Sequence, residues 1–199
     1  MGEASRPRLG RQRRVGGDEA AEVFCADEQT EVPVDVARWQ RLAEAVLLAE
    51  GVRGGTELSL LFIDRASITE LNETHLGAAG PTDVLSFPID AGELVEIVAG
   101  PGGATRGPDR PPGDLSDLPL LLGDVVICPA VAAEQAGGHA GTIEDELALL
   151  VVHGILHVLG HDHAEPDEAA RMRRRELELL EAHHWGAPPP AGFRQEHSA

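Results

Sequence analysis

Apolar residues recur along this chain with helical and strand periods in turn. Between Asp35 and Glu50 they fall every three or four positions, which predicts an amphipathic helix that Gly51 ends. Short runs rich in apolar residues predict buried strands at 23–25, 58–63, 84–87 and 120–128. Further helices are expected at 67–77, after 129, at 143–159 and from 166 to about 184. The first of these is assigned a capping box of Ser67 and Glu70, and the third a Thr142 cap.

This alternation predicts the α/β (α+β) class, with one small mixed sheet and about five helices in a single domain at 19–185. Residues 1–18 are polar and rich in arginine and are expected to be a disordered tail. A stretch rich in Gly and Pro at 91–118 indicates a surface insertion, and 186–199 a flexible C-terminal tail. The chain has no apolar run of about 18 residues and no signal-peptide pattern. We therefore expect a cytoplasmic location and no membrane partner.

The net charge of the chain and its distribution limit the functions that the protein can have. The net charge is −18, which argues against a protein that grips nucleic acid with its whole surface. The charge is uneven, since five arginines and one glutamate give residues 1–14 a net charge of +4, leaving −22 for the rest. A second basic cluster lies late in the chain, at Arg171 and Arg173 to Arg175. It is either a solvated helix face or a patch that grips phosphate.

The candidate chemistry lies in HGILHVLGHDH, residues 153–163, which holds four of the nine histidines. His153 and His157 are four apart, so they leave the same face of a helix one turn from each other. Gly160 can adopt the left-handed conformation that ends a helix and turns His163 back toward that face. Three imidazoles with one position left for water form the ligand set of a catalytic zinc site, so one zinc per chain is predicted. His161 is expected to point elsewhere.

The same histidine spacing occurs in metzincin proteases, which makes a peptidase the first alternative. Those enzymes carry a glutamate directly after the first histidine, and this carboxylate takes the proton from zinc-bound water. The corresponding residue here is Gly154, which has no side chain. The spacing of the ligands is retained and the peptidase base is missing.

Three sequence blocks resemble the YbeY-type endoribonucleases, or rRNA maturation factors. They are LeuAsn at 71–72 with ProThrAspValLeuSerPhePro at 81–88, GlyAspValValIle at 123–127, and the histidine segment at 153–163. The resemblance covers about 20–184. It implies a single α/β domain, one zinc on His153, His157 and His163, and cleavage of single-stranded RNA. It also implies late maturation of the 16S rRNA 3′ end and ribosome quality control, with the 16S precursor, the 30S subunit and its associated proteins as partners.

The chain departs from that family at Leu76, where members commonly carry an arginine thought to face the RNA. Two sets of residues are candidates for binding substrate, while no general base is identified. They are Thr82, Asp83 and Ser86 around a buried strand, and Arg173, Arg174 and Arg175 after the histidines. Thr82 and Asp83 could equally satisfy the amides of a turn. A zinc endoribonuclease is the first hypothesis; a zinc metallopeptidase-like hydrolase and a ribosome assembly factor with a structural zinc are the alternatives.

Overall fold

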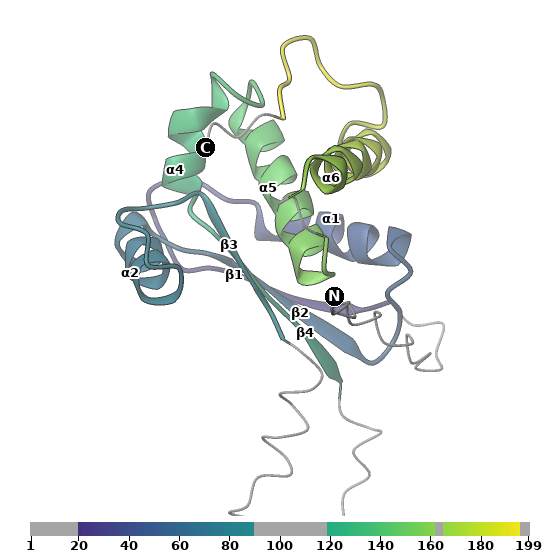
Figure 1. The fold of residues 1–199 in the computed structure, drawn as a ribbon, viewed down its shortest axis with the longest axis horizontal. Coiled ribbons are helices and arrows are strands. Elements are labelled where there is room, and N and C mark those ends of the chain that lie inside the picture. Colours follow the sequence, from purple (N-terminus) through teal and green to yellow (C-terminus); the bar gives the residue numbers. More distant parts are fainter. Residues whose placement is uncertain (1–19, 90–118, 162–164, 196–199) are drawn as a thin grey trace, which may run out of the picture.

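A computed structural model describes residues 20–89, 119–161 and 165–195 (Figure 1). The predicted tail at 1–18, the predicted insertion at 91–118 and the predicted ligand His163 lie outside the described residues.

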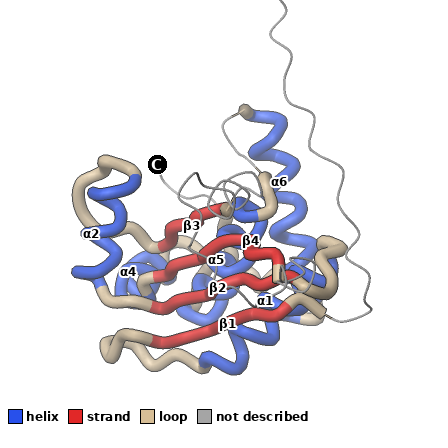
Figure 2. Tube along the Cα trace, turned by 90° about the horizontal axis from the view of Figure 1, so that it is seen from below, coloured by secondary structure: helices blue, strands red, loops and turns tan. Residues whose placement is uncertain are grey.

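Four strands form one mixed sheet in the order β1-β2-β4-β3 (Figure 2). They are β1 (Glu22–Asp27), β2 (Thr56–Phe62), β3 (Val84–Pro88) and β4 (Leu120–Ile127). Strand β2 pairs in parallel with both β1 and β4, whereas β3 pairs antiparallel with β4. The mixed sheet and all four predicted strands are therefore confirmed.

Helices cover both faces of this sheet. They are α1 (Val36–Ala49), α2 (Arg65–His75), α4 (Pro129–Ala136), α5 (Ile143–Val158) and α6 (Pro166–Leu180), with a π-helical turn η2 (Glu181–Trp185) continuing α6. Figure 1 shows α1, α5 and α6 grouped on one side of the sheet and α2 on the other. Five α-helices and four strands among the described residues make this an α/β domain, as predicted.

Two apolar clusters hold the layers together. The larger one lies between the sheet and the α1, α5 and α6 layer, where Leu58, Leu60 and Phe62 of β2 are fully buried. The smaller one lies under α2, where Ile68 is fully buried against the opposite face of the sheet. Because alternate residues of a strand point to opposite faces, one run of apolar residues can supply both clusters. Helix α5 is thus packed in the interior, which fixes the residues it carries.

The start of α2 differs from the prediction. The helix begins at Arg65, and its cap is Asp64, whose Oδ1 accepts a hydrogen bond of 2.8 Å from the backbone N–H of Ser67. Ser67 therefore lies inside the first turn and is not the capping residue. That backbone hydrogen bond holds the pKa of Asp64 below its usual range. Aspartate and serine are both good caps, so the pattern at Ser67 and Glu70 was a competing signal three residues too late.

The C-terminal segment, which the sequence predicts to be flexible, makes specific contacts as far as Gln195. Phe193 packs against the larger apolar cluster and contacts the ring of Trp185 at 4.8 Å between centroids. The side-chain nitrogen of Gln195 donates to the backbone carbonyl of Arg173 and to Glu176. These contacts place the segment over α6. None of the helices in the described part of the chain is long and apolar enough to cross a membrane.

Candidate metal centre

Both ends of α5 are built as the sequence predicts. At its start the hydroxyl oxygen of Thr142 accepts a hydrogen bond from the backbone N–H of Asp145 at 3.1 Å. At its end Gly160 has φ +88, a left-handed conformation that suits glycine. The N–H groups of Gly160 and His161 then donate to the carbonyls of His157 and Leu156, both at 2.9 Å. This hydrogen-bond pattern reverses the chain directly after the two histidines of the helix.

His153 and His157 lie one helical turn apart and face each other. Their Nε2 atoms are 3.1 Å apart, and their rings meet edge to face at 4.5 Å between centroids. Both side chains are partly exposed, although α5 is otherwise almost fully buried. The predicted pairing of the two imidazoles is therefore confirmed. No third histidine, cysteine or carboxylate completes a ligand group within the described residues, and His163 lies outside them.

Glu176 of α6 holds the ring of His153, an interaction that the sequence did not predict. Its Oε1 lies 2.8 Å from His153 Nδ1, and its Oε2 accepts from the side chain of Gln195 at 3.1 Å. Glu176 is only 3% exposed. A carboxylate at Nδ1 favours the tautomer that carries its proton there, so the lone pair of Nε2 points toward His157. Imidazole ligands of metals are commonly oriented by such a carboxylate.

A signal for Glu176 was present in the sequence. The buried residues of α6 recur at helical spacing on one face of the helix: Met172, Glu176, Leu179 and Leu180. A glutamate on an apolar stripe requires a buried hydrogen-bond partner. The pattern could have marked Glu176 as a residue with a role, although not His153 as its partner.

Gly154 lies where α5 presses on the sheet. A Cβ atom at this position would be 2.5 Å from Val125 Cγ1 and 3.2 Å from Ser86 Oγ. The first distance is shorter than carbon atoms tolerate, and the Val125 methyl group belongs to a buried β-branched side chain of β4. Any larger residue would push the helix away from the sheet. Packing of α5 on the sheet therefore also excludes a glutamate at position 154.

The polar residues around β3 fall into two groups. Asp83 is buried, and its Oδ1 accepts from the backbone N–H of Val84 at 2.9 Å and from the hydroxyl of Thr82 at 3.2 Å. Thr82 and Asp83 thus make the local contacts expected if they satisfy the amides of a turn. Ser86 instead donates to the carbonyl oxygen of Gly154 at 3.2 Å, one residue after His153. Ser86 therefore contacts the helix that carries the histidines.

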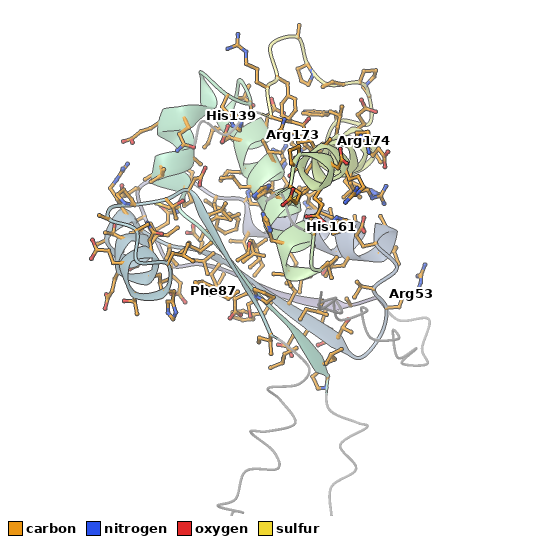
Figure 3. The ribbon with its side chains drawn as sticks, in the orientation of Figure 1. Arg53, Phe87, His139, His161, Arg173 and Arg174 are labelled. Carbon is orange, nitrogen blue, oxygen red and sulfur yellow. The ribbon has the colours of Figure 1, made fainter. Side chains whose placement is uncertain are left out.

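The arginines of the basic cluster on α6 differ in whether they form ion pairs. Arg175 donates to Glu50 and Glu178, each at 2.7 Å, and these hydrogen bonds raise its pKa. Arg173 and Arg174 are exposed and have no ion pair with any described carboxylate (Figure 3). Arg175 therefore ties α6 to the end of α1, which leaves the other two as candidates for an external anion.

His161 lies beside the same carboxylate. Its Nε2 is 3.8 Å from Oε2 of Glu50, at the end of α1. Leu76, where the family commonly has arginine, follows α2 on the other side of the sheet and is 65% exposed. It supplies no charge there.

Comparisons with known proteins agree with this architecture. The sequence pattern of the family described as "Endoribonuclease YbeY" matches residues 24–184. Proteins named Endoribonuclease YbeY are similar to this chain in Mycolicibacterium vanbaalenii, 41% identical over 82% of the chain and 81% of the relative, and in Beutenbergia cavernae, 44% identical over 76% and 91%. The solution structure of TM1509 from Thermotoga maritima shares the fold, with a TM-score of 0.50 and 22% identity over 83% of this chain and 89% of that one.

The matched region contains the whole sheet from Phe24, the paired histidines of α5 and Glu176, which holds the ring of His153. It ends one residue before Trp185, at the end of the helical layer. A match of this extent, together with relatives more than 40% identical, leaves one conclusion: the chain belongs to the YbeY family of endoribonucleases.

Proposed function

We propose that this protein is a zinc-dependent endoribonuclease specific for single-stranded RNA, with His153, His157 and His163 holding one zinc per chain. The observation that carries the proposal is the 3.1 Å separation of the two Nε2 atoms. Two nitrogens on a tetrahedral zinc, each about 2.0–2.1 Å from it, would be roughly 3.3 Å apart. A proton or a cation between the two nitrogens accounts for so short a contact. The pair therefore fits a metal without a change of backbone.

The residues have separate roles in this proposal. His153 and His157 bind the metal through Nε2, and Glu176 positions His153 from behind. A zinc bound there supplies a Lewis acid for a phosphoryl oxygen and lowers the pKa of a bound water toward 7. Ser86 holds α5 against β3, while Arg173 and Arg174 attract the RNA backbone. The reaction is hydrolysis or transesterification of a phosphodiester, and the attacking group is a water molecule or the 2′-OH of the RNA.

Family membership supports a proposal for the biological setting. We infer that the substrate is the 16S rRNA precursor, cut late in maturation of its 3′ end on the 30S subunit in the cytoplasm, with a part in ribosome quality control. Gly154 argues against the peptidase alternative, because the general base is absent and a Cβ does not fit. An assembly factor with a structural zinc is the remaining alternative. Co-sedimentation of a metal-ligand variant with the 30S subunit distinguishes the two hypotheses. If zinc has a structural role, the variant should no longer bind the 30S subunit. If the protein is an enzyme, the variant should still bind the subunit.

The direct test is cleavage of an RNA that carries the 16S 3′ end, with and without a chelator, beside casein as a protein substrate. Cleavage that disappears with the chelator and returns with zinc, and no casein hydrolysis, is expected. Zinc-dependent hydrolysis of casein without RNA cleavage would instead establish the peptidase. RNA cleavage that is unchanged in the zinc-free protein would overturn the role of the metal.

Glu176 provides a test of the metal centre away from its ligands. Glu176→Ala is expected to lower zinc affinity by about 10–100-fold, the usual cost of losing such a carboxylate, because the His153 ring is no longer oriented. Competition with a zinc indicator measures this. Glu176→Gln keeps an acceptor oxygen for Nδ1–H and should recover part of the loss. Glu178→Ala, a change on the exposed side of the same helix, is the control. Equal zinc affinity for wild type and Glu176→Ala would show that the interaction with His153 is not linked to the metal.

The two free arginines of α6 are expected to contact phosphate. Arg173→Gln/Arg174→Gln should lower RNA affinity and flatten its salt dependence by about 1.4 log units per log unit of salt, at roughly 0.7 for each phosphate bound on single strands. Zinc content should stay the same. Deleting residues 1–14 should have a smaller effect if the sequence prediction of a disordered tail is correct, because such a tail loses entropy when it binds. If affinity and salt slope match wild type, α6 presents only a solvated face.

A further inference from the structure

A small basic hollow lies where η2 meets the first turns of α1. Its volume is about 170 Å³. Its lining contains two arginines, two histidines and two apolar residues: Arg38, Trp39, Arg41, Leu42, His183 and His184. None of these lining residues is acidic, although the chain as a whole has a net charge of −18. The hollow is therefore lined by cationic, imidazole and apolar groups on a chain that is acidic overall.

Ring contacts and hydrogen bonds hold two of the side chains that line the hollow. Trp39 is 2% exposed and stacks with His184 at 6.3 Å between ring centroids and 29° between ring planes. His184 Nε2 lies 2.9 Å from Oδ1 of Asp145, which also accepts from Trp185 Nε1 at 2.6 Å. Burial alone would raise the pKa of Asp145, but the hydrogen bonds from Trp185, Thr142 and His184 outweigh it and lower the pKa. The fixed carboxylate holds both rings in place.

The two arginines at the hollow are not neutralised by neighbours. Within the described parts of the chain neither Arg38 nor Arg41 forms an ion pair, whereas Arg65 and Arg175 each have carboxylate partners. The guanidinium carbon of Arg38 lies 4.8 Å from the centre of the Trp39 ring, which fixes its position by a cation–π contact. Guanidinium groups bind phosphate oxygens in a fork geometry. Because Trp39 is covered, the hollow offers charge to a phosphate and no open ring to a base.

The hollow lies in the same helical layer as the paired histidines, at its other end. Trp39 and Asp145, near the starts of α1 and α5, meet through His184, while Glu50 and His161 meet where both helices end. The starts of the two helices are therefore linked at one side of the layer and their ends at the other. From Asp145 to His153 is eight residues of α5, or about 12 Å at 1.5 Å per residue. That separation exceeds the reach of a single phosphodiester.

We propose that this hollow binds a backbone phosphate of the RNA, several nucleotides away from the bond that is cleaved. The inference rests on the proposed function for the identity of the ligand, while the hollow itself does not depend on the metal. It gives the enzyme a second point of attachment, so substrate length decides affinity. Short RNAs reach only the histidines, whereas longer ones reach both places.

The test compares Arg38→Gln/Arg41→Gln with a control that removes two arginines elsewhere, Arg53→Gln/Arg65→Gln. Arg53 is exposed before β2 (Figure 3). Arg65 lies at the start of α2, where it pairs with Glu134. Binding of a labelled 16S 3′-end RNA is measured by anisotropy over a range of salt, on RNA that a denaturing gel shows to be intact. The Arg38/Arg41 variant should bind about 10-fold more weakly, with a salt slope smaller by roughly 0.7 for each phosphate that the variant no longer binds. The control should match wild type.

Cleavage kinetics give an independent readout. For the long RNA, KM should rise in the Arg38/Arg41 variant with kcat unchanged, because the hollow does not touch the reacting bond. A trinucleotide should be cleaved equally by variant and wild type. Equal loss on the trinucleotide, the same loss in the control, or unchanged affinity for long RNA would each overturn the proposal.

The two proposals fail in different ways. RNA that is bound through Arg38 and Arg41 but never cleaved would refute the endoribonuclease and support the hollow. RNA that is cleaved with zinc but indifferent to these arginines would do the reverse. A thermal melt of each variant ensures that only folded protein is compared.

Discussion

Replacing His157 with alanine is expected to abolish both zinc binding and RNA cleavage. The substitution removes one of the two facing Nε2 atoms, and the remaining ligands, His153 and His163 in this proposal, are too few to hold zinc. Loss of a direct ligand should cost more than the 10–100-fold that an orienting carboxylate costs, so zinc affinity should fall by more than about 100-fold. Metal analysis of the purified protein measures the stoichiometry, and cleavage of the 16S 3′-end RNA measures activity.

His161→Ala is the matched control for that substitution. It removes an imidazole four residues further along the chain, one that lies 3.8 Å from Glu50. Zinc content should remain near one per chain. One zinc per chain in His157→Ala would show that the metal is bound at another place. Loss of zinc in His161→Ala as well would mean that His161 is also a ligand.

Gly154→Glu is expected to destabilise the protein strongly without creating a peptidase. The new side chain would enter the interface between α5 and the sheet, where even a Cβ would be 2.5 Å from Val125 Cγ1. It would also bring an unpaired carboxylate toward buried apolar residues. Together these effects should lower the free energy of unfolding by roughly 3 kcal/mol or more. Chemical denaturation measures the change, and casein hydrolysis should remain absent in the folded fraction.

Two alanine substitutions separate crowding from charge. Gly154→Ala introduces only the Cβ, so the overpacking cost of about 1–3 kcal/mol is partly offset by the roughly 1 kcal/mol that alanine gains over glycine in a helix. Gly137→Ala is the control, because nothing lies within 4 Å of its Cβ position and its φ of −64° is ordinary. It should be neutral or slightly stabilising. A neutral Gly154→Glu would mean that α5 can move away from the sheet, and the packing account of the missing base would be wrong.

The interaction of Glu176 with His153 shows which part of the candidate centre was beyond sequence reasoning. The i, i+4 spacing of His153 and His157 and the helix-ending Gly160 are properties of one segment, and they predicted the facing imidazoles. Glu176 lies 23 residues from its partner on another helix. Its place on the apolar stripe of α6 indicated a buried partner, but which one depends on how α6 packs against α5.

The ion pairs of the arginines on α6 were likewise beyond what the sequence could predict. In sequence Arg173, Arg174 and Arg175 are equivalent candidates for binding phosphate. The fold brings Glu50, 125 residues away, against Arg175 and leaves the other two exposed. Likewise, Arg38 and Arg41 became a candidate site only when η2 closed a hollow over the start of α1.

By itself the sequence determined the strands, the helices, the histidine pair and the family, because periodicity, caps and short motifs act within one segment. Even there, Asp64 displaced Ser67 as the cap of α2, since neighbouring polar residues compete for the same backbone groups. The tertiary structure decided which carboxylate holds His153, why a side chain at position 154 is crowded and which arginines of α6 have carboxylate partners. Those features depend on packing between segments distant in the chain, which no local pattern encodes.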